Sequence, residues 1–213
     1  MGGKAHWENI YATKSDRELS WYRDRLDASL ELIERAHLPE NAAIIDVGGG
    51  ASTLVDDLLR MGFRDVTVLD LSAGALEQAR RRLGALSVSV HWIEGDVTTA
   101  KLAPEHYDLW HDRAVFHFLT GAGERSAYVT AATRTVKQGG FLILATFALD
   151  GPAKCSGLPV QRYGAEDLAG QFPAFTIVEH RREQHRTPAG SPQPFTCVLM
   201  QKRSERLAAE PNT

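Results

Sequence analysis

The chain has 213 residues, of which 43% are hydrophobic and 24% are charged, and its formal net charge at pH 7 is −3. This composition is typical of a globular α/β protein with a sizeable core, and the acidic balance argues against a nucleic-acid partner. The two cysteines lie far apart without metal-ligand spacing, and the N-terminus has no apolar signal segment, so we expect a cytoplasmic protein with no disulfide framework, metal or membrane partner.

Residues 1–38 are predicted to form an N-terminal arm followed by a helix. Trp7 and Tyr11 stand four residues apart, which places them on one face of a helix. Apolar residues from Trp21 to Ala36 recur at three- and four-residue spacing, with Ser20 as a potential cap. Two roles remain open for the arm: packing against the main domain, or acting as a lid over a ligand.

A buried strand over residues 42–47 leads into the turn Gly48-Gly49-Gly50. Glycine allows a backbone to turn sharply and to approach a ligand closely. Ser52 or Thr53 can cap the helix predicted over residues 52–61, whose first amides would point at the same ligand. The pattern predicts the first strand–helix turn of a nucleotide-binding α/β fold.

Two acidic residues indicate which cofactor this turn serves. Thr53 occupies the position of the third glycine in the dinucleotide fingerprint, which disfavours a nicotinamide cofactor. Asp46 precedes the glycines and suits a cationic group such as the amino group of a methionine moiety. Asp70 ends the next predicted strand and suits ribose hydroxyls.

Strands alternate with helices along the rest of the chain, which predicts a parallel sheet with right-handed crossovers. Two consecutive strands at the end, 175–181 and 195–201, predict a hairpin around a Pro-rich turn. We therefore expect an α/β fold: a Rossmann-like, seven-stranded, mostly parallel sheet with a C-terminal antiparallel β-hairpin and helices on both faces. The main domain is predicted over 39–203, with a flexible tail over 204–213.

Five short motifs and their order along the chain resemble those of the class I S-adenosylmethionine-dependent methyltransferases. The aromatic N-terminal arm resembles that of small members of this family. The five motifs are Asp46-Val47-Gly48-Gly49-Gly50, Leu69-Asp70, Gly95-Asp96-Val97, Tyr107-Asp108-Leu109 and Lys137-Gln138-Gly139-Gly140. The resemblance implies the cofactor S-adenosyl-L-methionine, with S-adenosyl-L-homocysteine as its product. It also implies cofactor contacts from Trp7, Tyr11, Trp21, Asp46, Gly48, Gly49, Gly50, Asp70, Leu71, Asp96, Val97, His111 and Asp112.

Candidate catalytic and substrate-binding residues follow the fourth and fifth predicted strands, because ligands of open α/β sheets bind beyond the carboxyl ends of the strands. The catalytic candidates are Asp112, Arg113 and His117, and the substrate-binding candidates are Arg113, Cys155, Arg162 and Tyr163. The loop over 149–163 is long enough to form a substrate wall. A structural ion pair between Asp112 and Arg113, a packed core histidine at 117 and an ordinary loop cysteine at 155 stay open as alternatives. We expect His185 to be exposed.

The leading hypothesis is a methyltransferase that acts by in-line displacement on a small-molecule acceptor, with a soft sulfur, selenium or tellurium atom or a nitrogen as nucleophile. A protein lysine N-methyltransferase is the first alternative, and a non-catalytic cofactor-binding partner module is the second. A soft nucleophile needs little base catalysis, and no obligatory general base stands out in the sequence. We expect a monomer or a weak homodimer.

Overall fold

The computed structural model describes residues 3–15 and 18–204 of the chain. Residues 1, 2, 16 and 17 of the predicted arm, and residues 205–213 of the predicted tail, lie outside the described residues.

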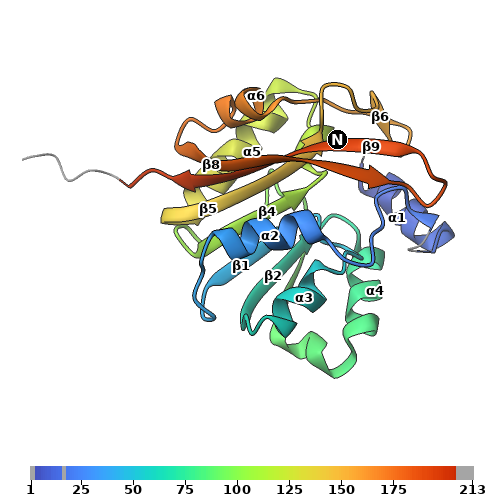
Figure 1. Ribbon diagram of the computed structural model, residues 1–213. Helices are drawn as coiled ribbons and strands as arrows, with labels where there is room; N and C mark the ends of the chain where they lie inside the picture. Colours follow the sequence, from blue (N-terminus) through green and yellow to red (C-terminus); the bar gives the residue numbers. More distant parts are fainter. Residues whose placement is uncertain (1–2, 16–17, 205–213) are drawn as a thin grey trace, which may run out of the picture.

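The centre of the molecule is a seven-stranded sheet with the order β3-β2-β1-β4-β5-β9-β8 (Figure 1). Five strands run parallel, and β9 and β8 continue the sheet in antiparallel fashion, which confirms the predicted fold and hairpin. The parallel strands are β1 (Ala43–Val47), β2 (Asp65–Asp70), β3 (Val90–Glu94), β4 (Tyr107–Arg113) and β5 (Val136–Phe147). The hairpin strands are β8 (Phe175–Arg186) and β9 (Pro192–Lys202).

Helices cover both faces of this sheet, because each strand directs alternate side chains to opposite faces. Ile44 packs into a core formed with α2 (Asp27–Arg35), α3 (Leu54–Arg60) and α4 (Ala73–Leu83). Its neighbour Ile45 packs into a second core formed with α5 (Ala122–Thr135) and α6 (Ala165–Gly170). Ser72 caps α4, and its side chain accepts a hydrogen bond from the Ala75 amide. Two short 3₁₀ helices, η2 (Gly84–Ser89) and η3 (Phe116–Phe118), follow α4 and β4.

The helix predicted from Ser20 begins only at Asp27, so the predicted cap at Ser20 is wrong. Residues 18–26, which we call the strap, instead cross the end of the sheet without forming an α-helix. Two backbone carbonyls of the strap accept tertiary hydrogen bonds: that of Ser20 from His185 Nε2, and that of Trp21 from Arg113. These bonds replace the intrahelical bonds that the apolar periodicity predicted.

Two further expectations change in the C-terminal third. The hairpin strands extend well beyond their predicted ends, so that His185 lies within β8 and is buried instead of exposed. The loop over 149–163 contains a small hairpin of β6 (Lys154–Cys155) and β7 (Leu158–Pro159), which buries Cys155.

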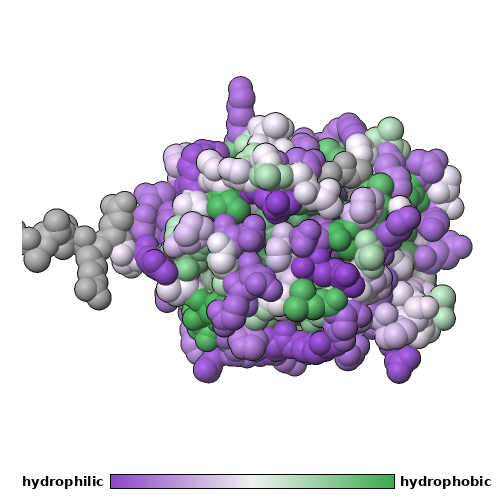
Figure 2. Space-filling model, turned by 90° about the horizontal axis from the view of Figure 1, so that it is seen from above, coloured by the Kyte–Doolittle hydropathy of each residue, from purple (hydrophilic) through white to green (hydrophobic). Residues whose placement is uncertain are grey.

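Hydrophobic residues on the face seen from above lie in small patches separated by hydrophilic ones (Figure 2). Among the described residues, no helix combines the length and the apolar character that crossing a bilayer requires.

Candidate active site

Two adjoining pockets lie at the carboxyl ends of β1, β2 and β4, the edge at which open α/β sheets bind ligands. Both pockets are lined by Tyr11, Trp21, Val47, Gly48 and Arg113. The first is also lined by Trp7, Leu69, Asp70, Leu71, Gly95, Val97, Ala114, Val115, Phe118 and Cys155. The second adds Leu19, Tyr22, Arg23, Leu26, Asp46, Gly49, Ala51, Ser52 and His111.

The glycine turn after β1 makes room for the two carboxylates beside it. A Cβ atom on Gly49 would lie 2.5 Å from Asp46 Oδ2, and one on Gly50 would lie 2.6 Å from Asp70 Oδ2. Gly48 has a φ of +69°, and a Cβ atom there would lie 2.0 Å from Val115 Cγ2. These glycines therefore serve the packing of the protein's own side chains around the pockets, in addition to turning the backbone.

Asp46 presents one free carboxylate oxygen in the second pocket. Its Oδ1 atom lies 2.7 Å from His111 Nδ1, and His111 Nε2 lies 2.9 Å from the Ser29 hydroxyl. All three side chains are buried. The other oxygen, Oδ2, is buried and has no hydrogen-bond partner among the described residues. A buried carboxylate oxygen without a partner suits a cationic ligand group that donates hydrogen bonds.

Asp70 lies at the end of β2, in the wall of the first pocket. Its Oδ1 atom accepts a hydrogen bond of 2.8 Å from the Ser72 amide. Burial raises the pKa of Asp70 to about 7; the Ser72 amide lowers it, and the charge of Asp46 adds to the rise. A ligand that donates hydroxyl hydrogen bonds would favour the ionised carboxylate.

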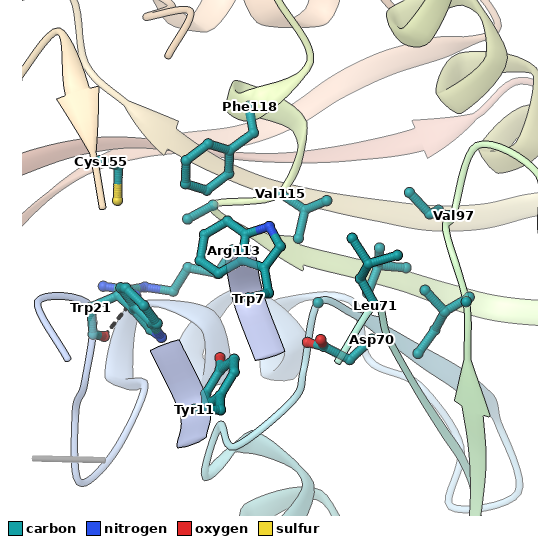
Figure 3. Close-up of a pocket in the computed structure, with 15 residues that line it drawn as sticks. Trp7, Tyr11, Trp21, Asp70, Leu71, Val97, Arg113, Val115, Phe118 and Cys155 are labelled. Atoms are coloured by element: carbon teal, nitrogen blue, oxygen red, sulfur yellow. Dashed lines mark hydrogen bonds between the residues drawn. The ribbon is translucent and has the colours of Figure 1, made fainter. Parts of the chain in front are cut away.

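The arm helix α1 (Lys4–Thr13) closes the first pocket with aromatic rings. The ring of Trp7 packs edge-on against those of Trp21 and Phe118, at centroid distances of 5.9 and 5.1 Å. Figure 3 shows Trp7 between Asp70 on one side and Trp21 and Cys155 on the other. The lid hypothesis for the arm is thus compatible with its position over the pocket.

Glu8 attaches α1 to the main domain. Its carboxylate accepts hydrogen bonds from the amides of Ala73 and Gly74 and from the Ser72 hydroxyl, at 2.8, 3.3 and 3.0 Å. Burial acts to raise the pKa of Glu8, but these donors hold it below its usual value. A carboxylate at the N-terminus of α4 is favourable because it satisfies amides that lack intrahelical partners.

Comparisons with known proteins agree with this geometry. Residues 44–140 match the family model described as a methyltransferase domain. A curated relative, EEF1A lysine methyltransferase 2 of Danio rerio, is 26% identical over 164 residues, which cover 68% of this chain and 68% of that protein. A solved S-adenosylmethionine-dependent methyltransferase of Anabaena variabilis superposes with a TM-score of 0.73 at 17% identity, covering 95% of this chain and 96% of that one. Residues 44–140 are thus similar to a methyltransferase domain, and the chain has the fold of solved S-adenosylmethionine-dependent methyltransferases.

A second similar structure holds ligands. The 1,6-didemethyltoxoflavin-N1-methyltransferase of Burkholderia thailandensis, with bound 1,6-didemethyltoxoflavin and S-adenosylhomocysteine, superposes with a TM-score of 0.67 at 19% identity. The alignment covers 94% of this chain and 84% of that protein, and at this identity it shows a shared fold alone.

Most of the predicted cofactor contacts of this protein meet in the two pockets. Nine of the predicted site residues line the first: Trp7, Tyr11, Trp21, Gly48, Asp70, Leu71, Val97, Arg113 and Cys155. Asp46, Gly49 and His111 line the second. Gly50 packs behind them against Asp70, and Asp96 accepts hydrogen bonds from the amide and hydroxyl of Thr98 at the pocket edge. The roles proposed for these residues stay predictions.

Asp112 and His117 do not reach either pocket. Asp112 is fully buried and accepts hydrogen bonds from the amides of Val115 and Phe116 and from the Tyr128 hydroxyl. Burial raises its pKa to about 6. His117 is also fully buried, receives the Phe147 amide at 3.4 Å, and has its pKa lowered to about 3 by burial. This geometry favours structural roles for both residues.

The predicted substrate-binding residues do not all lie at the first pocket. Cys155 faces the first pocket as a neutral thiol, because burial raises its pKa to about 11. Tyr163 instead packs into the second core against Phe116, and Arg162 donates to the Gly151 carbonyl. Arg113 forms no ion pair with Asp112; its carboxylate partner is Glu183 on β8.

Sequence reasoning missed Glu8 and Glu183, and it missed the pocket walls formed by Val115 and Phe118. Glu8 lies within α1 and has no motif of its own. Glu183 belongs to an alternation of charged residues on β8 that is typical of a solvated face. The backbone of Ala114, which also lines the first pocket, adopts a φ of +75°; such strain is concentrated at functional sites.

Proposed function

We propose that this protein is a methyltransferase that binds S-adenosylmethionine across the two pockets and transfers its methyl group to a small-molecule acceptor. The observation that carries the proposal is the pair of buried carboxylates, Asp46 and Asp70, which end adjacent strands and flank pockets joined at Gly48. When bound, this cofactor supplies an electrophilic methyl group on a sulfonium.

The residues of the site match the parts of such a cofactor. Asp46 Oδ2 would accept from the α-amino group, and Asp70 would accept from the ribose hydroxyls. Leu71 and Val97 would pack against the adenine base. Trp7 and Trp21 would face the cationic sulfonium, since aromatic faces attract cations, and would exclude water from the transfer.

The lining of the first pocket supports a small acceptor. Beyond the cofactor residues, the first pocket continues between the arm and the β6–β7 hairpin, where Trp7, Phe118 and Cys155 line it. Alignment of the acceptor with the methyl group is the main requirement of an in-line displacement, and a pocket walled by several elements can hold a small acceptor in line.

Thermal unfolding with S-adenosylhomocysteine tests the cofactor, with NAD as the control. Ligand at 100 times its dissociation constant should stabilise the fold by about 2.7 kcal/mol. Stabilisation by S-adenosylhomocysteine alone supports the proposal. Stabilisation by NAD alone, or by neither compound, contradicts it.

A protein lysine methyltransferase is the second candidate, and the similarity to the Danio rerio protein favours it. A methylation assay on peptide arrays and on a panel of small thiols and amines discriminates between the two. Transfer to lysine peptides with none to the small molecules would replace the leading proposal. Cofactor binding with no transfer to either would favour a non-catalytic module.

A further inference from the structure

Arg113 brings a buried and incompletely satisfied cation to the junction of the two pockets. Its side chain is 6% exposed. One terminal nitrogen, Nη1, donates to the Trp21 carbonyl at 3.2 Å, and the guanidinium carbon lies 4.5 Å from the centre of the Phe195 ring. The nitrogens Nε and Nη2 are buried and have no hydrogen-bond acceptor within the described parts of the chain. Figure 3 shows Arg113 behind Trp7, extending toward Trp21.

The charge around Arg113 is only partly balanced. Glu183 Oε1 lies 3.5 Å from Arg113 Nη2, but the same carboxylate also pairs with Arg23. Burial acts to raise the pKa of Glu183, but the charge of Arg113 and the hydrogen bond and charge of Arg23 hold it below its usual value. One carboxylate therefore faces two guanidinium groups.

The other titratable groups near this pair carry no compensating charge. Burial lowers the pKa of His185, which keeps its imidazole neutral at pH 7. Burial also raises the pKa of the Cys155 thiol to about 11 and that of the Cys197 thiol to about 12. The cluster of Arg23, Arg113 and Glu183 thus carries a net positive charge beneath the first pocket.

The carboxylates of Asp46 and Asp70 do not neutralise this positive charge when an acceptor binds. Under the proposed function, on which this inference rests, Asp46 and Asp70 are occupied by the amino and ribose groups of the cofactor. Arg23 lines the second pocket with Asp46 and provides a cation for the amino-acid end of the cofactor. The remaining surroundings of Arg113 in the first pocket are Trp7, Phe118 and Cys155, which are apolar or uncharged.

We propose that the methyl acceptor is a small anion with an apolar, planar body, and that the Nε and Nη2 donors of Arg113 bind its carboxylate or an equivalent oxyanion. An arginine fork matches a carboxylate in geometry and charge, and buried donors without partners are satisfied by such a ligand. A lysine ammonium group in the first pocket would instead be repelled by the guanidinium of Arg113. The aromatic rings of Trp7, Trp21 and Phe118 provide flat faces for the body of the acceptor.

Binding of three matched probes to the protein saturated with S-adenosylhomocysteine tests this proposal. Benzoate, benzamide and benzylamine share one ring and differ in charge, and calorimetric titration measures each affinity. Benzoate should bind about tenfold tighter than the other two, or more, because charge-assisted hydrogen bonds are the strong ones. The variant Arg113→Gln should abolish this preference. Arg113→Lys should retain part of it, since the charge remains while the fork is lost.

The control variant is Arg134→Gln, which removes an exposed arginine that donates to the Leu102 carbonyl and lines neither pocket. It should leave the benzoate preference unchanged. If the wild-type protein with bound S-adenosylhomocysteine had equal affinities for the three probes, this inference would be overturned while the proposed function would stand. That result does not depend on whether the variants fold. Failure of the wild-type protein to bind S-adenosylhomocysteine would overturn the proposed function and this inference with it.

A further experiment tests whether Arg113 binds the carboxylate of the acceptor or the carboxylate of the cofactor. 5′-Methylthioadenosine lacks the amino-acid end of S-adenosylhomocysteine. If Arg113→Gln weakened S-adenosylhomocysteine about tenfold and left 5′-methylthioadenosine unchanged, Arg113 would belong to the cofactor carboxylate and the inference would fail. If the wild type and Arg113→Gln had equal affinities for S-adenosylhomocysteine and only the variant lost benzoate binding, the inference would be supported.

Discussion

The Asp46 carboxylate and the His111 imidazole lie 2.7 Å apart beneath the second pocket, and each is nearly fully buried. His111 is in turn 2.9 Å from the Ser29 hydroxyl on α2, so three elements fix the orientation of one carboxylate. One oxygen of Asp46 is held by this chain of contacts, which leaves the other for a ligand.

We therefore expect Asp46→Asn to weaken the amino-acid end of the cofactor site selectively. The amide keeps the shape of the side chain but loses the charge that attracts an ammonium group. The dissociation constant of S-adenosylhomocysteine should rise about 10- to 100-fold, while that of 5′-methylthioadenosine, which has no amino group, stays unchanged. Calorimetric titration measures both. An equal loss for the two ligands would assign Asp46 to the general structure of the pocket.

Glu8→Gln should loosen the arm. The neutral amide accepts weaker hydrogen bonds from the amides of Ala73 and Gly74, so α1 closes the first pocket less often. We expect S-adenosylhomocysteine to bind several-fold more weakly and trypsin to cleave faster at Lys14. The matched control is Lys4→Met, which removes an exposed ion pair between the arm and Glu94. Equal effects of the two variants would contradict a specific attachment through Glu8.

Asp70 should make cofactor affinity depend on pH. With a pKa near 7, it takes up a proton as the pH falls from 8 to 6, and ribose hydroxyls donate better to the ionised form. The affinity for S-adenosylhomocysteine should fall over this range by up to about tenfold per pH unit in the wild type, and much less in Asp70→Asn. Parallel pH profiles for the two proteins would refute this assignment.

The same residue predicts the opposite trend for stability. Its folded pKa lies above the unfolded value of about 3.9, so the folded state binds more protons between pH 4 and 7. The stability that Asp70 contributes is full below pH 4 and is lost as the pH rises to 7, at up to about 1.4 kcal/mol per pH unit. Denaturant unfolding of ligand-free Asp70→Asn should therefore show a growing advantage over the wild type as the pH rises.

Gly48→Ala should destabilise the protein by about 1–3 kcal/mol and weaken the cofactor site. Two causes add here: a φ of +69° and a contact of 2.0 Å with Val115. Gly84→Ala is the control, because Gly84 has a φ of +57° and nothing lies within 4 Å of the added atom. Chemical denaturation should show a larger loss at position 48. Equal losses of stability in the two variants would mean that the backbone angle accounts for the whole effect and that the contact with Val115 contributes nothing.

Local patterns were sufficient to predict the sheet and the positions of its acidic residues. Asp46 and Asp70 follow apolar runs in the sequence, and parallel strands bring their carboxyl ends to one edge. Ser72 was predictable as a cap because serine before an apolar helix satisfies a free amide. These features depend on neighbours within a few residues.

The contacts around Arg113 could not be predicted in this way. Trp21 fits the apolar periodicity of a helix, yet its carbonyl is taken by a side chain 92 residues away. Glu183 alternates with other charged residues as a solvated strand would, but α2 and the strap cover that face of β8. Burial of these charges is decided by tertiary packing, which local spacing does not encode.

The hairpin that ends the sheet also sets the order in which the site can be assembled during synthesis. The strap reaches its final position only when Ser20 is bonded to His185 and Arg23 to Glu183, partners separated by 165 and 160 residues. A nascent chain can form β1, β2 and the glycine turn long before these partners leave the ribosome. The floor of the first pocket can therefore be completed only after β8 has been translated, because its contacts are distant in sequence.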